Sequence, residues 1–253
     1  MRHIIASGGG EIGRPGYPIE TLEIDIEVIN MTNKKKPNIL FVPTASGDPT
    51  PYCITVDEYF GKKHGCNVES ILLTKNKYTE KEMVNKVEWS DIVYVGGGNS
   101  LKLMNKWRAT GFDKVLEQQY KNGKIMYGLS AGSICWFEYG GSFAKRFTNT
   151  EASLIRVKGM GLIKYVNCPH YNMASEGQTG RKEQFKELLR KHKGIGIAND
   201  ECCAIEIKNN EYRIIKSKET AKAYKVYWKN KEFHEIELTN INEYRSMYEL
   251  EET

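Results

Sequence analysis

A serine lies between two glycines at the end of an apolar run, in a G-x-S-x-G motif formed by Gly128, Ser130 and Gly132. Residues 124–129 before it have the pattern of a buried strand, and residues 134–137 after it have that of a helix. A serine at a sharp strand-to-helix turn has strained backbone geometry and an exposed hydroxyl, which suits nucleophilic attack. The following helix would direct the Ala131 N–H at a developing oxyanion. We therefore expect a nucleophile elbow, with an ordinary glycine-bounded turn as the alternative.

A second backbone donor is expected at another strand end. Residues 92–95 form an apolar run, and three glycines and an asparagine follow at 96–99. Glycines let a backbone N–H approach a reacting carbonyl without an intervening side chain. The same residues also fit a tight turn into a helix that Asn99 or Ser100 caps, and the two interpretations are compatible.

A nucleophilic serine needs a base, and His170 has the most suitable position of the five histidines. It follows the apolar run 161–168, so it lies at the carboxyl end of an expected strand, where α/β proteins place their sites. The alternative is a buried structural histidine. The other four are assigned structural places: His3 begins a strand, His64 and His192 end helices, and His234 lies in a charged hairpin.

A third group should orient that histidine. Asp200 and Glu201 follow the strand-like residues 194–198. Two adjacent carboxylates cannot both point into one site, and Asp200 can instead cap a turn. Glu138 is a more distant candidate, so the residues alone leave the acid open.

Apolar runs alternate with helical patterns along the first 200 residues, which predicts an α/β fold with a mostly parallel sheet and helices on both faces. A capping box at Thr79 and Glu82 marks one helix start. From residue 204 to about 240 the pattern predicts two hairpins at the sheet edge, and 242–253 a frayed helical tail. We expect a single domain over 1–253. The expected strands are 2–7, 39–43, 68–73, 91–95, 124–129, 161–168 and 194–198; the expected helices are 19–31, 56–63, 79–89, 100–108, 112–122 and 181–193.

Composition excludes several classes. The 253 residues carry a net charge of +5, but the basic residues are scattered and no nucleic-acid motif accompanies them. No run approaches the ~20 apolar residues of a membrane span, and the N-terminus has no signal-peptide pattern, so we expect a cytoplasmic protein. The six cysteines have neither a disulfide framework nor metal-ligand spacing. We expect no metal, no membrane partner and no nucleic acid.

One tempting motif is rejected. Residues 8–13 satisfy G-x-G-x-x-G after a strand, as in a dinucleotide site. Such a site needs a helix to begin there, whereas Pro15, Gly16 and Pro18 follow and favour a loop. We expect a glycine loop at a strand end, which can still line an active site.

At these residues the sequence resembles the peptidase E family, which includes aspartyl dipeptidase, and its relative cyanophycinase. The resemblance covers roughly residues 1–215. Its landmarks are Gly-Gly-Gly-Asn at 96–99, Gly-Leu-Ser-Ala-Gly-Ser at 128–133, Pro-His at 169–170, and Asp-Glu at 200–201 followed by Ala-Ile at 204–205.

The resemblance implies a fold like the class I glutamine amidotransferase sheet, flavodoxin-like in type. It implies Ser130 as nucleophile, His170 as base and Glu201 as the orienting acid, with no cofactor. It also implies an oxyanion hole near Gly98 and Ala131, and we assign Gly97 and Asn99 to substrate contacts.

The segment after the elbow departs from the family. Aspartyl dipeptidase relatives carry an aspartate there, whereas residues 138–146 contain none. This favours Glu201 as the acid and puts aspartyl specificity in doubt. Lys145 and Arg146 fit either a solvated surface or a contact with an acidic substrate group.

The sequence therefore predicts an intracellular serine dipeptidase that acts on short peptides through an acyl-enzyme, as a monomer or homodimer. Two alternatives stay open at this point. One is another acyl hydrolase on the same fold, an esterase or an amidase. The other is a catalytically inactive relative that binds a small molecule.

Overall fold

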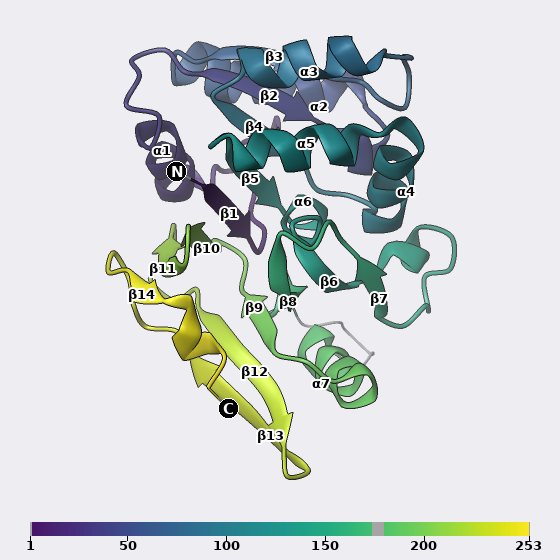
Figure 1. Ribbon diagram of the computed structural model, residues 1–253, viewed down its shortest axis with the longest axis vertical. Coiled ribbons are helices and arrows are strands. Elements are labelled where there is room, and N and C mark those ends of the chain that lie inside the picture. Colours follow the sequence, from purple (N-terminus) through teal and green to yellow (C-terminus); the bar gives the residue numbers. More distant parts are fainter. Residues whose placement is uncertain (1, 174–179, 253) are drawn as a thin grey trace.

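The computed structural model describes residues 2–173 and 180–252, and its strands form two mixed β-sheets. The first sheet has the strand order β14-β11-β10-β1-β5-β4-β2-β3, and the second has the order β13-β12-β9-β8-β6-β7. Figure 1 shows the parallel strands of the first sheet and their helices at one end of the molecule, with β12, β13 and α7 toward the other end and β10, β11 and β14 between them. The expected α/β class is confirmed, but two sheets replace the expected one.

Parallel pairing in the first sheet aligns the strand ends that matter for the site. Strands β1 (His3–Ser7), β5 (Ile125–Leu129), β4 (Ile92–Val95), β2 (Asn38–Val42) and β3 (Asn67–Ser70) run parallel in that spatial order. Ser7 lies opposite Leu129, and Val95 lies opposite Gly128. The loops that follow β1, β4 and β5 therefore leave the sheet at one edge, side by side.

Helices cover both faces of this sheet because each strand sends alternate side chains to opposite sides. Ile39 and Phe41 face the cluster that holds α1 (Leu22–Asn30) and α2 (Thr50–Val56), which continues as a π-helix over Asp57–Lys63. Leu40 and Val42 face the cluster that holds α3 (Glu80–Trp89), α4 (Ser100–Thr110) and α5 (Phe112–Lys121). Thr79 caps α3 with the predicted capping box.

The second sheet holds the strands that the later apolar runs predicted. Parallel strands β6 (Phe137–Ser142), β8 (Ile163–Cys168) and β9 (Gly196–Asn199) form its centre. The edge strand β7 (Ile155–Lys158) and the hairpin β12 (Ala223–Lys229) and β13 (Glu232–Glu237) complete it with antiparallel pairs. Helix α7 (Arg181–His192) packs against this sheet and ends just before Gly194, as expected.

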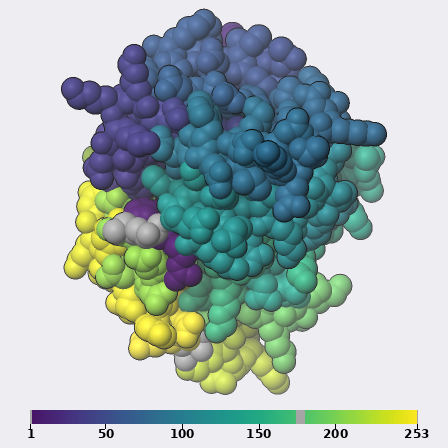
Figure 2. Space-filling view, turned by 45° about the horizontal axis from the view of Figure 1, so that its top comes forward, coloured from purple at the N-terminus to yellow at the C-terminus, as the bar shows by residue number. Residues whose placement is uncertain are grey.

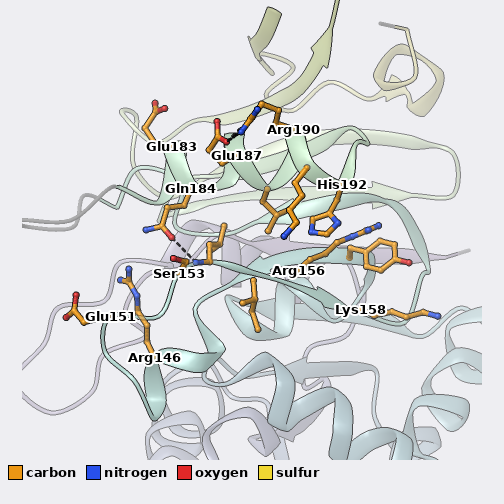
Figure 3. Close-up of a pocket in the computed structure, with 15 residues that line it drawn as sticks. Arg146, Glu151, Ser153, Arg156, Lys158, Glu183, Gln184, Glu187, Arg190 and His192 are labelled. Atoms are coloured by element: carbon orange, nitrogen blue, oxygen red, sulfur yellow. Dashed lines mark hydrogen bonds and ion pairs between the residues drawn. The ribbon is translucent and has the colours of Figure 1, made fainter. Parts of the chain in front are cut away.

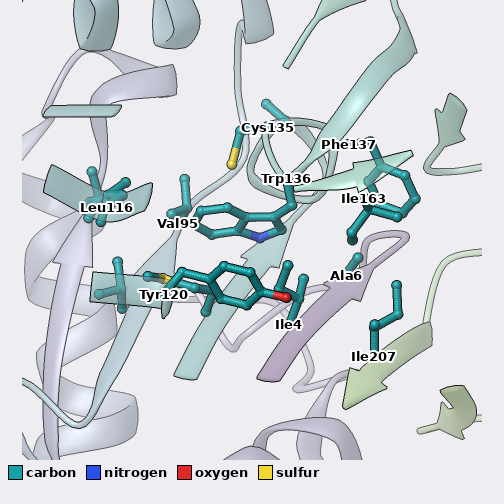
Figure 4. Close-up of a cluster of buried hydrophobic side chains, with 14 of the residues drawn as sticks. Ile4, Ala6, Val95, Leu116, Tyr120, Cys135, Trp136, Phe137, Ile163 and Ile207 are labelled. Atoms are coloured by element: carbon teal, nitrogen blue, oxygen red, sulfur yellow. The ribbon is translucent and has the colours of Figure 1, made fainter. Parts of the chain in front are cut away.

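One buried cluster joins the two sheets. Figure 4 shows Trp136 lying among Ile4 and Val95 of the first sheet and Phe137 and Ile163 of the second. The Trp136 side chain is fully buried, and Trp136 lies two residues after the end of the short elbow helix α6 (Ala131–Ile134). The elbow is therefore anchored by the buried cluster that both sheets share.

The structure corrects several expected elements. The run over 134–137 is not helical: α6 ends at Ile134, and Phe137 begins β6. Neither β6 nor β7 was expected. In β6, Gly140 and Gly141 weaken the strand pattern, and β7 has only four residues. The hairpin β10 (Cys203–Lys208) and β11 (Glu211–Lys216) does lie on the outer side of the first sheet, where only the two-residue β14 flanks it, but β12–β13 extends the second sheet.

The C-terminal tail is also different from the expectation. It forms the two-residue strand β14 (Arg245–Ser246) and a 3₁₀ helix over Met247–Leu250 instead of a frayed α-helix. Figure 2 shows the C-terminal residues, in yellow, gathered at the end of the molecule opposite the blue residues of the N-terminal half. Nowhere in the described ranges is a helix both long and apolar enough to cross a membrane.

Candidate active site

The predicted elbow is present. Ser130 follows the last residue of β5 and precedes α6, with φ 57° and ψ −109°, a conformation that an L-residue rarely adopts. The Ser130 N–H donates to the Ser7 carbonyl, which ties the turn to β1. A Cβ at Gly128 would overlap the Gly132 carbonyl, and one at Gly132 would overlap the Val95 carbonyl. Both glycines of the motif are therefore required by close backbone packing.

His170 lies beside this serine. Its Nε2 is 2.7 Å from the Ser130 Oγ, and its Nδ1 is 3.0 Å from the Glu201 Oε1. A carboxylate accepts hydrogen bonds only, so Nδ1 carries the proton and donates to Glu201. Nε2 is then unprotonated and accepts the Ser130 hydroxyl proton. The His170 side chain is 17% exposed, which leaves the histidine accessible from the site yet held by protein on most sides.

The two adjacent carboxylates point to different partners. Asp200 is buried, and its Oδ2 accepts the Lys222 N–H at 3.0 Å, while the backbone N–H of Asp200 donates to the Lys222 carbonyl. Burial raises the pKa of this carboxyl. The hydrogen bond from His170 instead lowers the pKa of the Glu201 carboxyl, which is anionic at neutral pH. Of the two, Glu201 is the one that the structure brings to His170.

The glycine loop after β1 shapes this site. The Gly8 carbonyl accepts the His170 N–H at 3.0 Å, and the Gly9 carbonyl accepts the Cys202 N–H at 2.9 Å. A Cβ on Gly9 would lie 2.5 Å from the His170 Nδ1. No helix begins here, because α1 starts only at Leu22, so the rejected dinucleotide motif is a loop as predicted. Sequence reasoning suggested only that such a loop can line a site.

A hollow of about 90 Å³ opens beside Ser130. Gly98 and Ala131 both line it, and among the described residues neither backbone N–H has an acceptor. A Cβ on Gly97 would lie 3.8 Å from the Ser130 Oγ, so Gly97 borders the same place. The side chain of Asn99 is used elsewhere: its Oδ1 caps α4 by accepting the Lys102 N–H, and its Nδ2 donates to the Ala144 carbonyl.

Three further residues that line the hollow were not proposed from the sequence. Phe143 and the exposed Phe147 come from the segment after β6, and Arg181 begins α7. The Arg181 guanidinium is buried and donates to the Pro169 carbonyl at 2.9 Å, and burial lowers its pKa. The sequence carries no local signal for these residues, because only the pairing of the second sheet brings them to Ser130.

Lys145 and Arg146, which the sequence left open, have different surroundings. Lys145 is exposed. The Arg146 guanidinium lies over the Phe143 ring, 3.6 Å from its centroid, and the Arg146 Nε donates to the Ala152 carbonyl at 2.8 Å. Arg146 is therefore held beside the wall of the hollow instead of extending into solvent.

Comparison with protein families identifies the family of this chain. The model described as peptidase family S51 matches residues 4–215. This chain belongs to peptidase family S51. It is a serine-type peptidase, and the resemblance to peptidase E inferred from the four motif segments is confirmed.

Similar proteins agree with this assignment. The uncharacterized peptidase YgaJ of Bacillus subtilis is 32% identical over 242 residues, which cover 94% of this S51 chain and 97% of that protein. Peptidase E of Streptomyces coelicolor is 24% identical over 193 residues, covering 75% and 72% of the two chains. The S51 assignment therefore extends across almost the whole chain.

Two solved structures share the fold. A crystal structure of a peptidase from an acI-B1 Actinobacterium superposes with a TM-score of 0.71 at 20% identity and covers 97% of both chains. A putative peptidase E from Listeria monocytogenes has a TM-score of 0.59 at 20% identity and covers 85% of this chain and 98% of that one. At such low identity the likeness supports the fold of this S51 peptidase and nothing finer.

Proposed function

We propose that this S51 peptidase hydrolyses short peptides through an acyl-enzyme formed on Ser130. The observation that carries the proposal is the continuous contact from the Ser130 Oγ through the His170 ring to the Glu201 carboxylate, at 2.7 and 3.0 Å. A nucleophile, its base and an orienting acid within hydrogen-bond reach is the arrangement that activates a hydroxyl.

Each group has a defined role in the proposed reaction. The Ser130 Oγ attacks the scissile carbonyl carbon while its proton passes to the His170 Nε2. The protonated His170 then gives that proton to the leaving amine, and the acyl group stays on Ser130. Water, deprotonated by the same Nε2, hydrolyses the ester and restores the serine. Glu201 holds the imidazole in the required tautomer and stabilises the imidazolium, without itself taking the proton.

The oxyanion that forms in this attack needs donors that are free before substrate arrives. The N–H groups of Gly98 and Ala131 line the hollow beside Ser130 and have no acceptor in the described part of the chain. The backbone beside each is held by a hydrogen bond, from the Asn99 N–H to the Ala45 carbonyl and from the Ser130 N–H to the Ser7 carbonyl, so little reorganisation accompanies charge development. We assign these two N–H groups to the oxyanion hole.

Hydrolysis of a panel of di- and tripeptides, with an ester of the same acyl group beside each, tests the proposal. Ser130→Ala should lower kcat/KM by at least about 1000-fold on every cleaved peptide. Ser133→Ala is the matched control, because the Ser133 hydroxyl is buried and donates to the Asn167 Oδ1. Circular dichroism checks that both variants fold.

Three outcomes would count against the proposal. One is cleavage of the esters alone, which would make the protein an esterase. Another is the absence of any hydrolysis together with tight binding of small molecules, which would make it an inactive binding relative. Undiminished peptide cleavage by the folded Ser130→Ala variant would remove Ser130 from the mechanism.

A further inference from the structure

A groove separate from the hollow at Ser130 lies between the edge strand β7 and helix α7, with a cavity volume of about 1430 Å³. Figure 3 shows Arg156 and Lys158 on the wall formed by the strand and His192 on the wall formed by the helix. A groove of this size accommodates several residues of a peptide chain, whereas the hollow of about 90 Å³ beside Ser130 holds far less.

The charges in this groove are unbalanced. Its acidic residues are Glu151, Glu183 and Glu187. Glu187 pairs with Arg190 at 2.6 Å, and Glu183 lies 3.8 Å from the Lys186 ammonium. The basic side chains are different. Within residues 2–173 and 180–252, no acidic partner faces the four basic side chains Arg156, Lys158, Lys191 and His192.

Arg156 is the most constrained of these side chains. Its guanidinium lies over the Tyr139 ring, 3.4 Å from the centroid, and its Nε is buried with no acceptor among the described residues. Stacking occupies the flat face of a guanidinium and leaves its edge N–H donors in the fork that a carboxylate accepts. The favourable effect of cations at a helix C-terminus accounts for Lys191 and His192 on α7, but not for Arg156 and Lys158 on the opposite wall.

The backbone of β7 is a poor template for an added strand. The Lys158 carbonyl accepts the Arg108 guanidinium at 2.7 Å, and the Leu154 N–H donates to the Gln184 Oε1 at 2.7 Å. A ligand in this groove would therefore be bound by side chains, and the side chains without an ion-pair partner in the described part of the chain, Arg156, Lys158, Lys191 and His192, are basic. These basic side chains are suited to bind a peptide chain that carries carboxylates.

The groove adjoins the hollow at Ser130. Arg146 lines the groove, and its guanidinium stacks on Phe143, which lines the hollow beside the serine. Phe143 and Arg146 therefore form the boundary between the two spaces, and a peptide that occupies both would cross it.

We propose that the groove between β7 and α7 binds an acidic stretch of a peptide, whose carboxylates pair with Arg156, Lys158 and Lys191. The identity of that peptide as a substrate rests on the proposed function, but the binding itself does not. The groove would add affinity for peptides that extend from the scissile bond as an acidic segment.

Binding of fluorescein-labelled hexaglutamate to the folded Ser130→Ala protein, followed by fluorescence anisotropy at low salt, tests the proposal. Lys158→Gln/Lys191→Gln should raise the Kd about tenfold, as expected for two partly exposed ion pairs. This pair uses exposed side chains, so the variant should fold. Arg156→Gln should raise the Kd further.

The matched control is Lys81→Gln/Lys114→Gln, which removes the same two charges from exposed positions on α3 and α5. It should leave the Kd within about twofold, because neither side chain lines the groove, and any change that it does cause measures the non-specific attraction due to net charge. Labelled hexaglutamine and inorganic phosphate are the comparison ligands, and neither should match hexaglutamate.

The proposal is overturned if the groove variant binds hexaglutamate like the control, or if hexaglutamine binds equally well. Displacement of hexaglutamate by phosphate at equal concentration would also overturn it, because the groove would then be a small-anion site. Failure here is distinct from failure at Ser130. The groove variants with Ser130 intact should still cleave short peptides, and loss of Ser130 chemistry leaves the binding result unchanged.

Discussion

Asp200 and Glu201 are adjacent carboxylates whose surroundings shift their pKa values in opposite directions. Asp200 is enclosed against the Lys222 backbone, and burial raises its pKa. Glu201 receives a hydrogen bond from His170, which lowers its pKa. Neutral pH therefore leaves an anion facing the imidazole, as an orienting acid must be.

Exchange of each carboxyl for its amide should separate the two roles. Glu201→Gln should lower kcat by roughly 10²–10⁴-fold with little change in stability, because the amide no longer holds the reactive imidazole tautomer. Asp200→Asn should do far less, since its side chain points away from His170. Side-by-side kcat/KM values on one dipeptide decide the matter. A crippled Asp200→Asn enzyme would mean that the acid was assigned to the wrong residue.

The local sequence predicts the nucleophile and the base of the site, but it does not decide which carboxylate is the acid. Ser130 and His170 follow apolar runs, and a strand end is readable from the pattern alone. For the acid the residues alone leave Asp200, Glu201 and the more distant Glu138 open, since which of two neighbours faces a distant histidine depends on packing, here of Asp200 against Lys222. Phe143 and Arg181 carried no signal, because the second sheet brings them to Ser130.

At the scale of elements, the loop Gly8–Gly10 connects β1 to the base of the proposed triad and to the residue that follows its acid. Gly8 and Gly9 accept hydrogen bonds from the backbones of His170 and Cys202, and Cys202 follows Glu201 directly. The loop therefore sets the separation between the imidazole and its acid. Gly9 also has φ 151°, a conformation that favours glycine.

Gly9→Ala should lower kcat by about 100-fold, because the added Cβ would lie 2.5 Å from the His170 Nδ1 and must displace the ring. Gly180→Ala is the control: its Cβ meets nothing within 4 Å, and its φ of −58° suits alanine. Peptide hydrolysis and thermal unfolding of both variants provide the measurement. A fully active Gly9→Ala enzyme would show that the loop does not position His170.

Strands and helices of the first sheet were predictable because their patterns are local. The division into two sheets was not predictable. The apolar runs of β8 and β9 would look the same whether these strands paired with β1 or with β6. Strand β6 was missed for a different reason: its two glycines have low strand propensity, and tertiary pairing with β8 compensates. Pairing partners far apart in sequence leave no trace in a single strand.

At the scale of the whole molecule, a buried carboxyl ties α1 to both the π-helix and the first sheet. Asp25 is fully buried and accepts hydrogen bonds from the hydroxyls of Thr21, Tyr59 and Tyr127. Desolvation raises its pKa to about 6 despite these bonds. The folded state therefore binds a proton that the unfolded chain releases near pH 4.

This predicts a stability that falls with rising pH. A carboxyl whose pKa is raised on folding contributes its full stability below the unfolded value, and that contribution is lost as pH rises through about 6. The loss amounts to about 2 kcal/mol between pH 4 and pH 7. Urea unfolding of the natural protein and of Asp25→Asn at both pH values measures this loss. The contributions of the other titratable groups cancel when the free energies of unfolding of the two proteins are subtracted. A difference that is independent of pH would refute the assignment.

The most direct test of the whole account is the site of fluorophosphonate labelling. This reagent captures an activated serine, and Ser130 is the serine hydroxyl that contacts His170 at 2.7 Å. Mass spectrometry of the digested protein should find one adduct, on Ser130, and His170→Ala should abolish it. An adduct on Ser133, or on any serine in the folded Ser130→Ala variant, would contradict the account.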